Sequence, residues 1–310
     1  MPDQSFDPEL EPLVRRAIGR LCDSLSRDAP WLGAEAISWM KNLSRSGRAE
    51  DYFLENRALL LLLPDELVKR ICAVSDDGFR SDLVYSTING YYFVRLIDNV
   101  MDAPNAAESR LLPLLGFFHS QFQTAYSPHF PPESGFWGFF QATVARMAEA
   151  TTQAAGMTEF TAEDFTRISS AKFGGGKIPL AAACFRYNRP DLLGPWCAFY
   201  DVFAAWSQTV DDLLDWTGDA VAGTATYFLS EANRRKRHDE SAAAWILREG
   251  LAWGYAESEM RMRQLHDMAK ELRSQPLTRY LAYRQRQLAS LWRDLQPQLD
   301  SLSRLALVLE

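Results

Sequence analysis

The sequence predicts an all-α fold, for three reasons. Most long segments repeat apolar residues at the spacing of one helix face. Strand-like alternation of Val, Ile and Thr is scarce, and the Asn89-Gly90 pair lies between helix-like stretches rather than between alternating strands. Proline and glycine fall between the helical segments, where they commonly interrupt a helix. From these breaks we expect roughly ten to twelve helices.

The expected helices lie between breaks marked by proline or glycine. In chain order the breaks are Asp28-Ala29-Pro30, Pro64, Ala103-Pro104, Pro128 to Pro132, Arg189-Pro190, Gly218 to Gly223, and Gln275-Pro276. No repeat of fixed period and no low-complexity linker divides the chain. We therefore expect one all-α domain over residues 1–310, in which residues 1–50 could form an N-terminal helical extension.

Composition and charge exclude several classes of protein. The formal net charge of -7 argues against a nucleic-acid surface, which would need a basic stripe. The acidic start MPDQSFDPELEP is unlike a secretory signal, and the apolar run Ala58–Pro64 is too short to span a bilayer. Transient membrane contact stays open. The four cysteines show neither CxxC nor zinc spacing, which predicts reduced, buried thiols in a cytoplasmic protein; they are Cys22, Cys72, Cys184 and Cys197.

Two aspartate ladders are the most informative feature of the chain. Asp98 and Asp102 lie in RLIDNVMDAP, and Asp211, Asp215 and Asp219 lie in SQTVDDLLDWTGD. A step of four advances a helix by about one turn, so each ladder projects from one face. Carboxylates stacked in this way repel each other, and divalent cations would relieve the repulsion. Oxygen ligands of this kind suit Mg²⁺, which substrate phosphates usually complete.

A lone DxxxD pattern is more often a solvent-exposed helix face than a functional site. The neighbouring residues decide between these two interpretations. The first ladder follows GYYFVRLI and the second follows VFAAWSQTV, which are apolar stretches. Polar groups embedded in apolar helices are normally paired or functional. Tyr91 and Arg95 share the face of the first ladder, and Gln208 shares the face of the second. The basic cluster Arg234–His238 is interpreted as a solvated helix end.

A run of three glycines precedes the second ladder, in SSAKFGGGKIPLAAACFRYN. Each glycine costs a helix about 1 kcal/mol relative to alanine, so the run marks a kink, close packing or the approach of a ligand. Lys177 follows it directly, without the full P-loop pattern. The simpler alternative is a helix break with a surface lysine. With the two ladders, this kinked segment and its lysine would surround a cation–diphosphate cluster.

Both ladder segments resemble signatures of the squalene/phytoene synthase family. YYFVRLIDNVMD resembles Y-x-F-C-R-x-x-D-D-x-x-D, with matches at Tyr91, Phe93, Arg95, Asp98 and Asp102, and with Asn99 in place of the second aspartate. SQTVDDLLDWTGDAVAG resembles L-Q-L-T-N-I-L-R-D-x-x-E-D-x-x-R-G-R, with matches at Gln208, Asp215, Asp219 and Gly223, and with Asp211 in place of asparagine. The likeness covers residues 91–229, and DDLLD also resembles the second aspartate motif of trans-prenyl diphosphate synthases.

The resemblance implies a class I isoprenoid or terpene synthase-type helical bundle around a central apolar cavity. Three Mg²⁺ would link both ladders to an allylic prenyl diphosphate of C10–C20 length. The implied metal ligands are Asp98, Asp102, Asp211, Asp215 and Asp219, and the implied diphosphate-binding residues are Arg95, Lys177 and Gln208. The metals would stabilise the leaving diphosphate, and aromatic faces would guide the carbocation. Tyr92, Phe173 and Trp206 are candidates for that role, with plain core packing as the alternative.

Departures from the second signature bear on the reaction type. Leu214 stands where the signature has arginine, and Ala222 and Thr224 replace the arginines of R-G-R. Positive charge for a second diphosphate is therefore missing, and the basic cluster Arg234–His238 could restore some of it only by folding over the cavity mouth, which is the alternative to its interpretation as a solvated helix end. We expect ionisation of one prenyl diphosphate, followed by cyclisation or quenching. The alternatives are a prenyltransferase that condenses two prenyl diphosphates or prenylates another acceptor, and a non-catalytic helical assembly protein. The enzyme would be a monomer or homodimer.

Overall fold

The computed structural model describes residues 7–56, 58–72, 76–102 and 107–309, with the side chains of 56, 102, 107 and 298–309 outside the description. Within these ranges the chain forms helices and turns and no strand, so the predicted all-α class is confirmed. The elements in order are α1 (Leu10–Asp28), α2 (Pro30–Asn42), α3 (Ala49–Asp51), η1 (Tyr52–Asn56), α4 (Ala58–Ile71), α5 (Asp77–Asp102), η2 (Ala107–Leu114), α6 (Leu115–Thr124), α7 (Gly135–Gly156), α8 (Ala162–Lys172), η3 (Gly174–Gly176), α9 (Lys177–Arg186), α10 (Pro190–Ala222), α11 (Tyr227–Arg235), α12 (Ala242–Trp245), η4 (Ile246–Gly250), α13 (Leu251–Glu271) and α14 (Gln275–Leu309).

Most predicted breaks fall between helices. α1 ends and α2 begins at Asp28 to Pro30, α10 begins at Pro190, and α14 begins at Gln275. Proline suits these places because its missing N–H lies among the unpaired donors of a first turn. Gly218 lies inside α10, which continues to Ala222 and is followed by Gly223, where φ is +71°. The break at Ala103-Pro104 lies outside the described residues.

The break predicted at Pro64 is wrong, because Pro64 lies inside α4. A proline there removes one helical hydrogen bond and crowds the preceding turn. The apolar residues before it, Leu61, Leu62 and Leu63, are almost fully buried. Burying each leucine side chain contributes roughly 2 kcal/mol, which together exceeds the cost of the proline. Tertiary packing therefore overrides the local preference at this position.

Contacts divide the chain into two compact units. The first comprises Met1–Ala142 and Gly175–Gly194, and the second comprises Thr143–Gly174 and Pro195–Glu310. Each unit is thus built from two stretches of chain, and α7 and α10 both contain residues of each unit. The single domain over residues 1–310 stays a prediction.

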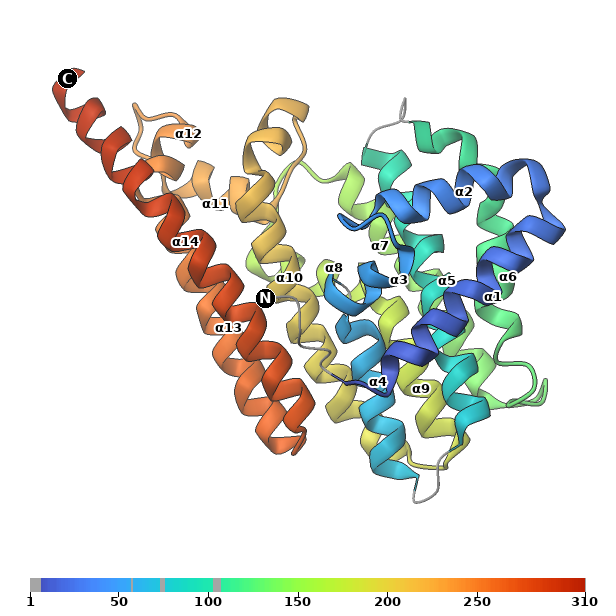
Figure 1. Cartoon of the computed structure of the whole chain (residues 1–310). Helices are drawn as coiled ribbons and strands as arrows, with labels where there is room; N and C mark the ends of the chain where they lie inside the picture. The colour runs from blue at the N-terminus through green and yellow to red at the C-terminus, as the bar shows by residue number, and fades with distance from the viewer. Residues whose placement is uncertain (1–6, 57, 73–75, 103–106, 310) are drawn as a thin grey trace. The chain divides into compact units, whose positions relative to one another are not determined.

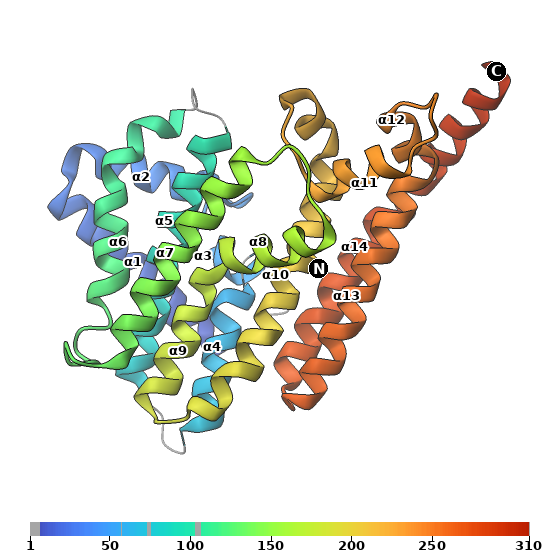
Figure 2. The same ribbon diagram turned by 180° about the vertical axis from the view of Figure 1, so that it is seen from behind.

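α5 is the central helix of the first unit. It contacts α1, α4, α6 and α9, and these neighbours can be followed in Figures 1 and 2. The contact with α6 is close, because a Cβ on Gly90 would lie only 2.9 Å from a ring carbon of Phe122. The Ser86 hydroxyl also donates to the Phe122 carbonyl oxygen at 2.6 Å. These contacts hold the helix that carries the first ladder.

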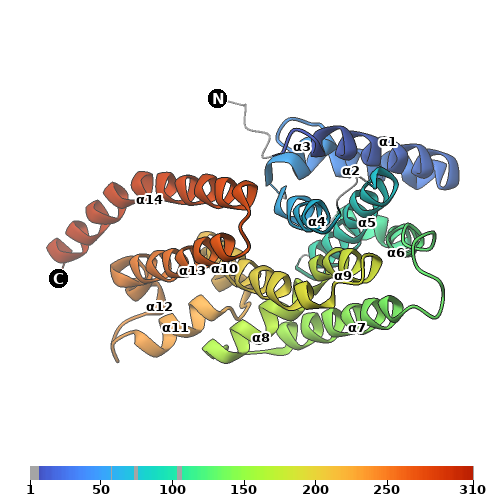
Figure 3. The ribbon, with the colours of Figure 1, turned by 90° about the horizontal axis from the view of Figure 1, so that it is seen from below.

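The second unit contains a helical hairpin and a compact apolar cluster. α13 and α14 lie side by side and antiparallel, joined by a short turn with Arg273 at φ +50° (Figure 3). The buried cluster comprises Leu213, Phe228, Ala232, Trp245, Ile246 and Leu251. Gly254 of α13 permits its close packing, because a Cβ there would lie 2.7 Å from Leu213 Cδ1. Leu213 thereby anchors the helix that carries the second ladder.

The cysteine and membrane expectations have mixed outcomes. All four cysteines are free thiols, as expected. Burial was predicted for all of them and holds for Cys184 only, because Cys22, Cys72 and Cys197 are half-buried. Cysteine composition carries no information on which helix face a thiol occupies. Among the described helices, none is long and apolar enough to cross a membrane.

Candidate active site

The first ladder lies on the last turns of α5. Asp98 and Arg95 are each 35% exposed at the side chain, and Arg95 Nη1 lies 3.6 Å from Asp98 Oδ2. The Nε of Arg95 is buried and has no hydrogen-bond partner. One turn earlier, the Tyr91 hydroxyl is hydrogen-bonded to the Tyr52 hydroxyl of η1 at 2.5 Å. The structure therefore brings Arg95 and Asp98 together, and the arginine keeps a donor available.

Asp102 is the last residue of α5, so the helical step from Asp98 holds along the backbone. The side chain of Asp102 lies outside the described residues. Its predicted role as a metal ligand stays a prediction.

The second ladder lies near the end of α10. The Asp211 and Asp215 side chains are exposed, and Asp219 is half-buried. Exposed apolar side chains accompany them, because Leu214 is 47% exposed and Val221 is 90% exposed. Leu214 and Val221 are seven residues apart, so they share one side of the helix. This stretch of α10 thus presents carboxylates beside a strip of uncovered apolar surface.

Asp212 is the polar residue that sequence reasoning missed. It is only 4% exposed, and its Oδ1 accepts a hydrogen bond from Gln208 Nε2 at 2.7 Å. Burial raises the pKa of Asp212 to about 7, and the charges of Asp211 and Asp219 act in the same direction. Hydrogen bonds from Gln208 and from the backbone N–H of Phe228 oppose this rise without cancelling it. The second ladder therefore has a buried carboxyl directly behind it.

Two signals in the sequence could have identified Asp212. It is four residues after Gln208, so the two side chains meet on the helix. It also stands at the isoleucine of the resembled signature, next to Leu213, where an apolar residue would be expected. A carboxyl in such a place needs partners, because burying it alone is costly.

Lys177 and the glycine run have the local structure that the sequence predicts. Gly174–Gly176 form a short 3₁₀ turn between α8 and α9, and Lys177 is the half-buried first residue of α9. A Cβ on Gly174 would lie 3.3 Å from side-chain atoms of Met147 and Thr143. Close packing therefore accounts for Gly174 without a ligand.

The candidate aromatic residues are mostly core. Tyr92 and Trp206 are fully buried, and Phe173 is half-buried. Trp206 packs against Phe203, and the Arg284 guanidinium lies 5.2 Å from its ring centroid. Neither the Tyr92 hydroxyl nor the Trp206 indole N–H has a hydrogen-bond partner. Their role as guides for a carbocation stays a prediction.

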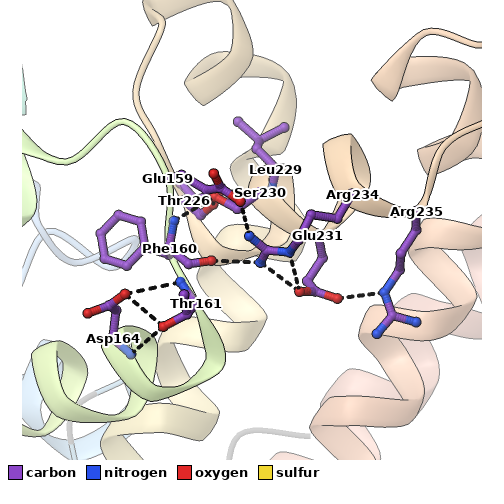
Figure 4. Close-up of polar contacts among 10 residues, drawn as sticks. All are labelled: Glu159, Phe160, Thr161, Asp164, Thr226, Leu229, Ser230, Glu231, Arg234 and Arg235. Atoms are coloured by element: carbon purple, nitrogen blue, oxygen red, sulfur yellow. Dashed lines mark hydrogen bonds and ion pairs between the residues drawn. The ribbon is translucent and has the colours of Figure 1, made fainter. Parts of the chain in front are cut away.

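Arg234 and Arg235 are engaged in a local network (Figure 4). Arg234 Nη2 donates to the Phe160 carbonyl at 2.7 Å and to Glu231 Oε1 at 2.6 Å, and the same guanidinium is paired with Glu159. Arg235 Nε donates to Glu231 Oε2 at 2.5 Å. Both arginines lie in the last turn of α11 and remain partly or largely exposed. This arrangement agrees with a helix end that fastens a neighbouring loop.

A pocket of about 460 Å³ in the first unit is lined by charged groups, including Lys69 and Arg80. Both cations are bound to the buried Asp65, with Arg80 Nε to Asp65 Oδ1 at 2.8 Å and Lys69 Nζ to Asp65 Oδ2 at 3.1 Å. The charges of this pocket are therefore paired within the protein. The central apolar cavity implied by the resemblance stays a prediction.

The two ladders belong to different contact units, α5 to the first and residues 211–219 of α10 to the second. Among the side chains that the structure describes, no three or more His, Cys, Asp or Glu gather closely enough to hold a metal ion. No protein-family model matches the chain, and no curated protein matches it.

Proposed function

We propose that this protein is a Mg²⁺-dependent class I terpene synthase, similar to the squalene/phytoene synthase family. It ionises one allylic prenyl diphosphate of C10–C20 length, releases pyrophosphate, and cyclises or quenches the carbocation. The observation that carries the proposal is the ladder face of α10, where the exposed Asp211 and Asp215 lie beside the exposed Leu214 and Val221. Such a face offers oxygen ligands for a charged head and apolar contact for a hydrocarbon chain.

The donor set fits Mg²⁺ in chemical type. Mg²⁺ prefers oxygen ligands and is usually bound by one or two carboxylates together with substrate phosphates. The side chains that would hold three ions are Asp98, Asp102, Asp211, Asp215 and Asp219. Bound there, Mg²⁺ would supply positive charge for the leaving diphosphate.

The chain's own residues would bind and orient the diphosphate. Arg95 supports this role because its Nε is buried without a partner while Nη1 lies 3.6 Å from Asp98. A guanidinium suits phosphate oxygens, since it presents several donors in a fixed plane. Lys177 and Gln208 are the other proposed contacts. Exclusion of water from the site would strengthen each of these interactions.

Leu214 favours ionisation of a single substrate over condensation of two. The resembled signature has an arginine at this place, and here an apolar side chain is exposed instead. A second diphosphate would meet no added positive charge there. Apolar surface is suited to a folded prenyl chain rather than to a phosphate.

The test is Mg²⁺-dependent release of pyrophosphate from C10, C15 and C20 prenyl diphosphates, with and without isopentenyl diphosphate, and with products identified by mass spectrometry. Asp98→Asn and Asp211→Asn should each lower turnover by at least about a hundredfold, the scale of losing one key electrostatic group. Asp239→Asn is the matched control, because Asp239 is exposed in the second unit outside either ladder. Unchanged turnover in both ladder variants, or no release from any of the three substrates, would contradict the proposal.

A further inference from the structure

We draw no further inference here: the strongest candidate, the pocket of about 460 Å³ at the C-terminal end of α4, is bordered by residues 73–75, which the structure does not describe, and its charged lining is paired within the protein, so nothing in the described residues shows which ligand it would take.

Discussion

Asp212→Asn should make the protein's stability less sensitive to pH. Burial holds the pKa of Asp212 at about 7 in the folded protein, against 3.8 for an ordinary aspartate. Below about pH 4 both folded and unfolded chains carry the proton, and the carboxyl has no effect of this kind. Between about pH 4 and 7 the unfolded chain loses its proton first, so the free energy of unfolding falls as the pH rises. Above about pH 7 the carboxyl is ionised in both states, and the full loss of unfolding free energy caused by its burial is present.

The size of this change in unfolding free energy follows from the difference between the pKa of Asp212 in the folded protein and that of an ordinary aspartate. A difference of about three pKa units corresponds to about 4 kcal/mol at 1.36 kcal/mol per unit, and about 2 kcal/mol of it develops between pH 5 and 7. Asp212 is only 4% exposed, so solvent screening reduces this little. Removing the ionisable group should therefore stabilise the variant relative to the wild type more at pH 7 than at pH 5.

The assay is urea unfolding of wild type and variant at pH 5, 6 and 7, followed by tryptophan fluorescence. The difference in unfolding free energy should grow by about 2 kcal/mol across this range. Asp212→Leu is the matched control, since it removes the same titration while changing the polarity and shape of the side chain. A difference that stays constant with pH in both variants would refute the reasoning.

Further predictions concern the substrate, the product and the packing. Arg95→Gln and Lys177→Gln should raise KM and lower kcat for prenyl diphosphate with the unfolding midpoint unchanged; unaltered kinetics in both would mean that the two cations are structural. Mass spectrometry should find products with the carbon number of the single substrate, whereas a product with twice as many carbons, or one formed only with added isopentenyl diphosphate, would favour condensation. Gly254→Ala should lower the free energy of unfolding by about 1–3 kcal/mol, because the added Cβ would lie 2.7 Å from Leu213 Cδ1. Gly138→Ala is the control: a Cβ at Gly138 would meet open space, so this variant should not be destabilised.

The sequence allows the helices and their main boundaries to be predicted, because those depend on neighbouring residues. Pro30 and Pro190 begin helices as proline does in general. Pro64 differs because its effect depends on how deeply the adjacent leucines are buried, which only the tertiary structure determines. Local sequence patterns therefore predict where helices begin and end, but they predict poorly which side chains are buried.

The same distinction between local pattern and burial explains which residues of the candidate site could be predicted from the sequence. The ladder spacing on α10 follows from the helical period, and the structure keeps Asp211, Asp215 and Asp219 on a continuous helix. Asp212 was missed because the step of four from Asp211 passes over it, and because the backbone N–H that binds its carboxyl belongs to Phe228, sixteen positions later in the chain. Which member of an Asp-Asp pair is buried is decided by the elements that pack on the helix.

The link between Arg234 and the loop at Glu159–Phe160 has a consequence for the order of folding during synthesis. Phe160 N also donates to the Ser230 hydroxyl at 2.9 Å, so three contacts join segments some seventy residues apart. The stretch Thr143–Gly174 belongs to the same unit as Pro195–Glu310, yet it leaves the ribosome much earlier. At about 5–20 residues per second, it waits on the order of several seconds for its α11 partners. During that interval the loop lacks its partners on α11, and the second unit closes only after α11 has been made.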